Sequence, residues 1–262
     1  MSEHAARPTR DSLRDQAYDP LSDQLCCVEV GASSIETVLL GPGAWWQRRD
    51  GLPTSIETPL LLAIPGVVSG GRVLAAANLG WYDVDPAQQL GLTRPAAVVC
   101  NDAQAAALGE SVLRPGDPDL VFVGLGTGVG GAVVTEGLAA ANLFAHGGSF
   151  GERGCACGRV GCLETIAGGW ALPRRLSAAE LPAIAAAIAT AVNNEPRATP
   201  RLVVLAGGLT AAHPALLSLL GQALPDRTVV PTAAIGTKSA AAWGLRHLYA
   251  SSAAEPRAVT AR

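Results

Sequence analysis

Residues 119–137 read DLVFVGLGTGVGGAVVTEG, an apolar run, a glycine-rich turn and a second apolar run. Valine recurs in both runs and no helical period survives, so the stretch predicts two strands joined by the turn. Residues 25–43, LCCVEVGASSIETVLLGPG, repeat this plan with a tight turn at Gly31. Each half of the chain therefore opens with a β-hairpin, which is a weak internal repeat.

Strands and helices alternate after both hairpins. Short apolar runs bounded by Gly, Pro or Asn predict buried strands at 58–68, 96–100 and 201–209. Helices are expected over 103–113, the Ala-rich segment 178–195 and the closing segment 236–249. This alternation in two similar halves predicts an α/β fold of two lobes with a cleft between them.

The chain has 262 residues, of which 49% are apolar, enough to bury a large core. Its expected organisation has five parts. They are an N-terminal tail over 1–24, a smaller α/β lobe over 25–105, a larger lobe with the cysteine cluster over 106–235, a closing helix over 236–250 and a flexible tail over 251–262.

Charge and hydropathy limit the partners. The net charge is −3, Lys238 is the only lysine and the arginines are scattered, so no nucleic-acid partner is expected. The polar first residues contain no signal-like run, and no segment is apolar enough to span a bilayer. We therefore expect a cytoplasmic protein without a membrane partner.

Three of the six cysteines lie within eight positions of GERGCACGRVGCLET, residues 151–165. The spacing C-x-C-x4-C lets three thiolates meet one tetrahedral zinc, whereas redox use more typically shows C-x-x-C. A structural zinc is the favoured interpretation, with small core cysteines and redox chemistry as alternatives. His146, nine residues before Cys155, is either the fourth ligand or an ordinary loop histidine.

The other three cysteines, Cys26, Cys27 and Cys100, lie in strand-like runs and are expected to be small core residues.

Two further features could carry chemistry. The glycine turn GLGTGVGG lets backbone N–H groups approach phosphates, and Thr127 adds a hydroxyl, although such turns also occur for purely geometric reasons. Asp102 falls at a strand end and a helix start. There it is either a general base for a substrate hydroxyl or the N-cap of the helix.

Together these segments resemble the ROK family (repressor, open reading frame, kinase) of sugar kinases and sugar-responsive repressors. CACGRVGCLE at 155–164 is similar to the family's zinc signature C-x-C-G-x-x-G-C-x-E, and NDAQAAALGE at 101–110 is similar to the segment with the catalytic aspartate. LGTGVGG resembles the second phosphate loop, and IPGVV with AANLGW resembles the sugar-lobe landmarks. LAGGL and SAAAWGL are similar to the adenosine-side strand and the closing helix.

The resemblance implies a two-lobed actin-like or hexokinase-like (ribonuclease H-like) ATPase fold with a central cleft. It implies ATP-dependent phosphoryl transfer to a hydroxyl of a sugar, aminosugar or sugar-like cyclitol, with Asp102 as the base. It also implies ATP, Mg²⁺ and a structural Zn²⁺ as cofactors, and a homodimer.

The resemblance also assigns residues to each group. Acceptor ligands would be Asn78, Asn101, Glu152 and Glu164, and Glu29 would lie on the magnesium side. ATP would contact Gly31, Ser33, Gly126, Thr127, Gly128, Gly130 and Gly131, with Gly207 and Gly208 beside the adenosine. The zinc ligands would be Cys155, Cys157, Cys162 and, as one alternative, His146.

The chain departs from the family pattern in several places. The first phosphate loop, usually D-x-G-G-T-K, reads EVGASS at 29–34, so the aspartate is a glutamate and the lysine is gone. Glu152 is followed by Arg-Gly-Cys where the family has a Gly-His, and the segment before LLLAIPG is too short for the helix usual there. These departures favour, as an alternative, a non-catalytic or regulatory sugar-binding protein. A repressor is disfavoured because the residues before 25 are too few and too polar for a winged-helix domain.

Overall fold

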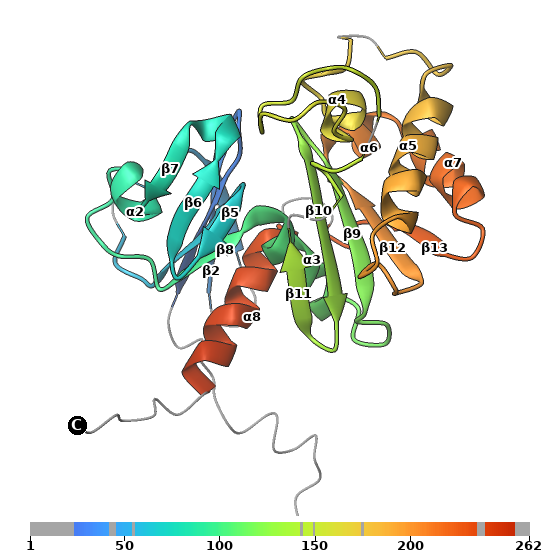
Figure 1. Cartoon of the computed structure of the whole chain (residues 1–262). Helices are drawn as coiled ribbons and strands as arrows, with labels where there is room; N and C mark the ends of the chain where they lie inside the picture. The colour runs from blue at the N-terminus through green and yellow to red at the C-terminus, as the bar shows by residue number, and fades with distance from the viewer. Residues whose placement is uncertain are drawn as a thin grey trace, which may run out of the picture.

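The computed structural model describes residues 24–41, 46–53, 56–141, 144–148, 150–173, 176–234 and 239–254. Two five-stranded sheets form two lobes, and the helices α3 (Asp102–Val112) and α8 (Ala240–Ala254) lie between them (Figure 1).

The first sheet has the strand order β3-β2-β1-β4-β8. β1 pairs antiparallel with β2 and parallel with β4, and β4 pairs parallel with β8. All five residues of β4 are buried, as expected for a continuous apolar run inside a parallel pair. The strands are β1 (Leu25–Val30), β2 (Ile35–Leu40), β3 (Trp46–Asp50), β4 (Leu60–Ile64) and β8 (Val98–Asn101).

The second sheet repeats this topology with the order β11-β10-β9-β12-β13. β9 pairs antiparallel with β10 and parallel with β12, which in turn pairs parallel with β13. The weak repeat seen in the two hairpins is thus confirmed as two sheets with one topology, and the predicted fold class is confirmed. The strands are β9 (Leu120–Leu125), β10 (Val129–Thr135), β11 (Leu138–Ala141), β12 (Leu202–Ala206) and β13 (Thr228–Pro231).

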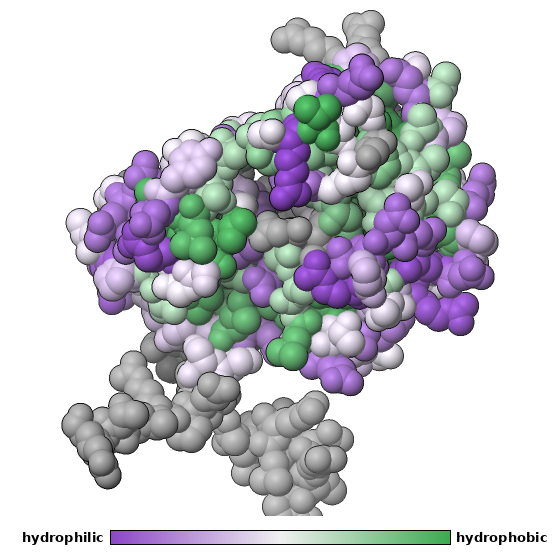
Figure 2. Space-filling model, viewed as in Figure 1, coloured by the Kyte–Doolittle hydropathy of each residue, from purple (hydrophilic) through white to green (hydrophobic). Residues whose placement is uncertain are grey.

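A small third sheet, β5-β6-β7, lies beside the first lobe. It buries Val73 and Ala76 against that lobe and exposes Val67, Leu74 and Tyr82, and apolar residues gather over β5 and β6 in Figure 2. The strands are β5 (Val67–Ser69), β6 (Arg72–Ala76) and β7 (Trp81–Val84), with the 3-10 turn η2 (Ala77–Leu79) and the helix α2 (Pro86–Gln89).

Helices cover both faces of the second sheet. α5 and α7 pack on one face in a shared apolar core, and α3 packs on the other (Figure 1). The remaining bounds are α4 (Glu164–Ala167), α5 (Leu181–Asn193), α6 (Gly208–Ala212) and α7 (Ala215–Ala223).

Two glycines let α3 and α8 cross at close range. A Cβ on Gly109 would lie 2.6 Å from the carbonyl carbon of Ala240, and one on Gly244 would lie 2.7 Å from that of Ala105. Real Cβ atoms are not found this close to backbone, so any side chain at either position would push the helices apart. The crossing fixes α3 against the closing helix.

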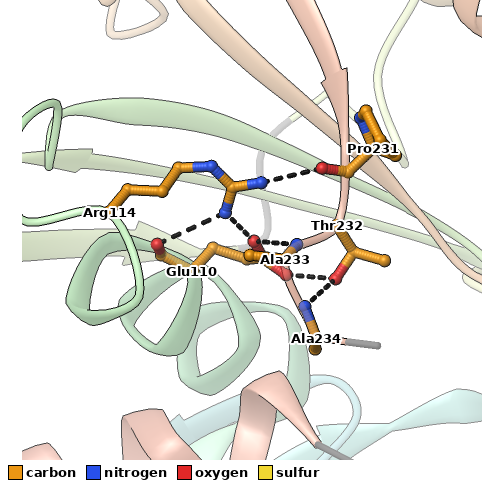
Figure 3. A network of polar contacts seen from close by, with 6 residues as sticks. All are labelled: Glu110, Arg114, Pro231, Thr232, Ala233 and Ala234. Carbon is orange, nitrogen blue, oxygen red and sulfur yellow. Dashed lines mark hydrogen bonds and ion pairs between the residues drawn. The ribbon is translucent and has the colours of Figure 1, made fainter. Parts of the chain in front are cut away.

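A buried carboxylate ties α3 to the second lobe (Figure 3). Glu110 is fully buried, forms an ion pair with Arg114 and accepts hydrogen bonds from the Thr232 hydroxyl and, at 2.9 Å, from the Ala233 N–H. Arg114 Nη2 also donates to the Pro231 carbonyl at 2.7 Å. Every polar atom of the carboxylate therefore has a partner, which a buried charge requires.

The element boundaries differ from the expected ones in several places. α8 begins at Ala240 and continues to Ala254, so residues 251–254, expected in the flexible tail, are helical. The expected division between residues 105 and 106 falls inside α3. β3, β7, β11, β13, α4, α6 and α7 were not predicted, and nearly all of the expected tail over 1–24 lies outside the described residues.

The three core cysteines were predicted correctly. Cys26, Cys27 and Cys100 are all buried in the first sheet. Burial raises the pKa of Cys26 to about 11 and that of Cys100 to about 12, so both stay protonated at neutral pH.

Within the described residues, none of the helices has the length and apolar character needed to cross a membrane.

Candidate active site

Asp102 is the first residue of α3, directly after β8 leaves the first sheet. Its side chain is half-buried, and Oδ1 accepts a hydrogen bond from the Ala103 N–H at 2.7 Å. Burial is the main reason that the pKa of Asp102 rises to about 6, and the negative charge of Glu164 adds to the rise. Such a carboxylate is ionised at pH 7 yet basic enough to accept a proton.

The N-cap of α3 is Asn101. Its Oδ1 accepts a hydrogen bond from the Gln104 N–H at 3.0 Å, and its Nδ2 donates to the Gly66 carbonyl at 2.9 Å. The capping interpretation of Asp102 is therefore wrong, which leaves that carboxylate available for chemistry. Both ends of the Asn101 amide are engaged with backbone, and its contact with an acceptor stays a prediction.

Glu164 begins α4 and is almost completely buried. Its Oε2 accepts a hydrogen bond from the Val129 N–H at 3.0 Å. A Cβ on Gly128 would lie 3.1 Å from Glu164 Cδ and 3.7 Å from Asn78 Nδ2. The structure thus brings two predicted acceptor ligands, one from each lobe, within 4 Å of the same point beside Gly128.

The two expected phosphate loops meet. Ser33 Oγ, in the first hairpin turn, lies 2.9 Å from Thr127 Oγ1, in the second. The second turn is closed by a hydrogen bond from the Gly126 N–H to the Gly128 carbonyl at 3.1 Å. Hydroxyls and backbone from both halves of the internal repeat therefore face one place between the lobes.

The second loop also packs onto the start of α3. A Cβ on Gly130 would lie 3.1 Å from Ala103 Cβ, so glycine allows the strand and the helix to approach closely. Gly131, the next residue, is buried in β10 opposite Val123. The candidate base is therefore adjacent to the candidate phosphate loop.

In the first loop, Glu29 is held by the closing helix. Ser239 Oγ donates to Glu29 Oε2 at 3.1 Å and accepts a hydrogen bond from the Ala242 N–H at 3.1 Å. The tight turn predicted at Gly31 is present, since its N–H donates to the Ser34 carbonyl at 2.7 Å. Glu29 thus places a carboxylate, the type of ligand that Mg²⁺ prefers, two residues before Gly31.

Gly207 lies against the end of β9, close to the second loop. Its φ of 101° suits only glycine, and a Cβ there would lie 2.8 Å from the Leu125 backbone nitrogen. Gly208 follows as the exposed first residue of α6. Both expected adenosine-side glycines therefore lie at the turn from β12 into α6.

His146 joins the three clustered cysteines. The ligand atoms of His146, Cys155, Cys157 and Cys162 all lie within 4.8 Å of one another. The His146 Nδ1–Cys155 Sγ distance is 3.5 Å and the Cys157–Cys162 Sγ–Sγ distance is 3.6 Å. A tetrahedral zinc with Zn–S bonds of about 2.3 Å places its sulfur ligands about 3.8 Å apart, so this donor set fits one zinc ion.

The cluster also borders the acceptor side. Cys155 Sγ lies 3.8 Å from Glu164 Oε1, and Arg159 Nη1 donates to the His146 carbonyl at 2.8 Å. Of the two interpretations of His146, the geometry favours the fourth ligand. A histidine from upstream of Glu152 thus lies beside the three cysteines, although the family's Gly-His after Glu152 is absent.

Glu152 lies exposed on the turn before the cluster. Among the described residues, no hydrogen bond joins it to Asp102, Asn78 or Glu164. Its role as an acceptor ligand stays a prediction.

Two contacts to the site come from residues that sequence reasoning did not single out, Ser239 and Trp170. Trp170 Nε1 donates to Glu164 Oε1 at 3.3 Å. The available signal was the pair of glycines before Trp170, because consecutive glycines indicate close backbone approach.

The chain has the two-lobed, actin-like or hexokinase-like fold. Its two sheets share one topology, each sheet carries a glycine turn, and a carboxylate lies at the start of the helix between them. The family model described as "ROK family" matches residues 54–203. The chain therefore belongs to the ROK family.

Curated relatives include N-acetylmannosamine kinase of Escherichia coli O157:H7, which is 33% identical over 178 residues, or 54% of this chain and 60% of the relative. Glucokinase of Halalkalibacterium halodurans is 36% identical over 126 residues, or 43% of this chain and 38% of the relative. The matched part of the chain thus spans less than two thirds of the length of either relative.

Solved structures agree on the fold. A ROK family glucokinase from Streptomyces griseus, in complex with glucose and AMPPNP, has a TM-score of 0.67 at 19% identity, covering 86% of this chain and 98% of the other. A ROK family transcriptional regulator has a TM-score of 0.62 at 18% identity, covering 92% of this chain and 84% of the other.

Proposed function

We propose that this protein is an ATP-dependent kinase that transfers the γ-phosphoryl group to a hydroxyl of a sugar, aminosugar or sugar-like cyclitol. The observation that carries the proposal is Asp102, a half-buried carboxylate with a pKa of about 6 that adjoins the second glycine loop. The kinase relatives support an acceptor of this class.

In the proposed reaction, Asp102 takes the proton of the acceptor hydroxyl as that oxygen attacks the γ-phosphorus, and the bond to the β–γ bridging oxygen breaks to release ADP. The loops at 31–33 and 126–131 surround the phosphates, and Gly207 and Gly208 lie beside the adenosine. Mg²⁺, held on the side of Glu29, would neutralise charge on the phosphates.

On the acceptor side, we propose Asn78 and Glu164 as the main ligands, because both lie close to the same point beside Gly128 and come from opposite lobes. Asn101 and Glu152 complete the proposed set. The zinc cluster forms the wall behind Glu164, and the protein is proposed to act as a cytoplasmic homodimer.

The test is an ATP-consumption screen over N-acetylmannosamine, glucose, other aminosugars and cyclitols, with Asp102→Asn as the control. Asparagine keeps the shape of the side chain and removes the proton acceptor. We expect turnover with at least one acceptor in the unchanged protein and its loss in the variant. Equal turnover in both proteins would exclude Asp102 as the base.

A second candidate is a non-catalytic sugar-binding protein. It is supported by the first phosphate loop, which has no lysine, and by Glu29, whose carboxylate is already bonded to Ser239. Calorimetric binding of a sugar together with no ATP consumption across the screen would favour this candidate.

A further inference from the structure

Residues 168–171, GGWA, form a short segment that directly follows α4. Its backbone reaches the second phosphate loop: the Gly169 N–H donates to the Gly126 carbonyl and the Trp170 N–H donates to the Thr127 carbonyl, each at 3.0 Å. The loop that we propose to hold ATP phosphates is therefore clamped by this segment.

The two glycines make this approach possible. A Cβ on Gly169 would lie 2.7 Å from the Gly126 carbonyl oxygen, and one on Gly168 would lie 2.6 Å from the Glu164 carbonyl oxygen. Both neighbours are backbone atoms, which cannot turn away as a side chain could. Glycine at 169 is thus a requirement of the contact with the loop, and glycine at 168 is a requirement of the turn out of α4.

The Trp170 side chain faces the acceptor side. Its indole N–H donates to Glu164 Oε1 at 3.3 Å, while Glu164 Oε2 is held by the Val129 N–H at 3.0 Å. The two oxygens of this buried carboxylate are thus fixed by two different segments. A carboxylate held in this way keeps one orientation.

Arg153 holds the indole ring from the direction of the metal cluster. Its guanidinium lies 4.7 Å from the centre of the Trp170 ring, within cation–π range, and its Nη1 donates to the Ala171 carbonyl at 2.7 Å. Arg153 lies two residues before Cys155, a proposed zinc ligand. Ring and backbone of the segment are therefore both anchored to the turn that begins the cluster.

We infer that Trp170 is a positioning residue that joins the acceptor carboxylate Glu164 to the phosphate loop, and that Arg153 fixes its indole. This inference rests on the proposed function. Trp170 reaches the two substrate sides through different groups, its indole N–H toward the acceptor and its backbone N–H toward ATP. The two links can therefore be broken separately.

Trp170→Phe removes the indole N–H and keeps an aromatic ring and the backbone. We expect KM for the acceptor to rise about tenfold, the typical worth of a hydrogen bond to a charged group, with KM for ATP unchanged. Gly169→Ala forces the segment away from Gly126, and we expect it to raise KM for ATP. A residue with a merely structural role would lower the melting temperature without separating the two KM values.

Trp243→Phe is the matched control, because Trp243 on α8 also lies under an arginine, with Arg246 at 5.1 Å from its ring centre. It should leave both KM values unchanged. Equal KM values for the acceptor in the Trp170→Phe variant and the unchanged protein would overturn the inference.

A second readout does not depend on turnover. In ¹⁵N–¹H spectra the Trp170 indole resonance, assigned by its absence in Trp170→Phe, should move in Glu164→Gln and on addition of AMPPNP. An indole resonance that stays in place both in Glu164→Gln and on addition of AMPPNP would overturn the inference. If the acceptor screen shows no turnover while the resonance moves, the proposed function fails and the link between Glu164 and the loop stands.

Discussion

Gly244→Ala tests the helix crossing that holds α3, and with it Asp102, in place. The new Cβ would lie 2.7 Å from the carbonyl carbon of Ala105 and 3.0 Å from the Gly109 nitrogen, and still closer to the Ala105 oxygen. These are backbone atoms of a helix packed on the second sheet, so the clash can be relieved only by parting α3 and α8. Overpacking of this kind typically costs about 1–3 kcal/mol, and we expect the upper part of that range.

Gly221→Ala is the control, because Gly221 also lies in a helix, α7, but has no neighbouring atom within 4 Å of its added Cβ. Alanine is the better helix former by about 1 kcal/mol, so this variant should be slightly more stable than the unchanged protein. Urea unfolding followed by circular dichroism would measure both variants. Equal free energies of unfolding for Gly244→Ala and Gly221→Ala would refute the close crossing.

Three further predictions follow from the site and its supports. The raised pKa of Asp102 means that its ionised form destabilises the folded state, an effect absent below about pH 4 and complete above about pH 6. At pH 7, Asp102→Asn should therefore raise the free energy of unfolding, measured in urea, by at most about 3 kcal/mol. At pH 3.5 the variant and the unchanged protein should have the same free energy of unfolding. Metal analysis should find one zinc per chain. Cys157→Ala should lose this zinc and have a lower melting temperature, whereas Cys100→Ala should retain the zinc. Glu110→Ala, which leaves Arg114 without its buried partner, should cost about 3–5 kcal/mol in urea unfolding, and a loss below 1 kcal/mol would contradict the network.

Much of the fold was predictable because its signals are local. The runs that became β1, β2, β4, β9, β10 and β12 are apolar and bounded by glycine or proline, and each was expected at nearly its observed place. β11 and β13 were missed because their residues are only partly buried and carry no alternation that distinguishes them from loops. Their strand character comes from pairing with β10 and β12.

The candidate site was predictable to a different degree. The cysteine spacing predicted three of the four side chains of the cluster. It could not decide whether His146 joins them, because the position of that ring depends on how the segment after β11 folds back. The cap at Asn101 was also undecidable from sequence, since Asn and Asp are equally good caps and adjacent here. Ser239 contacts Glu29, which is distant in sequence, and Trp170 contacts Glu164 across the end of α4. No local sequence pattern marks either contact.

The position of the metal cluster gives the cysteine spacing a function beyond holding a loop. Cys162 is a proposed zinc ligand. Glu164 follows two residues later as the first residue of α4, and its Oε1 lies 3.8 Å from the Sγ of Cys155. A metal bound there would restrain the Glu164 carboxylate in two ways: through the backbone from Cys162 and through the neighbouring Cys155 thiol. Because Glu164 is also bonded to Val129 at the end of the glycine turn, the orientation of the proposed acceptor ligand depends on metal and phosphate loop together. The cluster is then best understood as the fixed wall of the acceptor pocket.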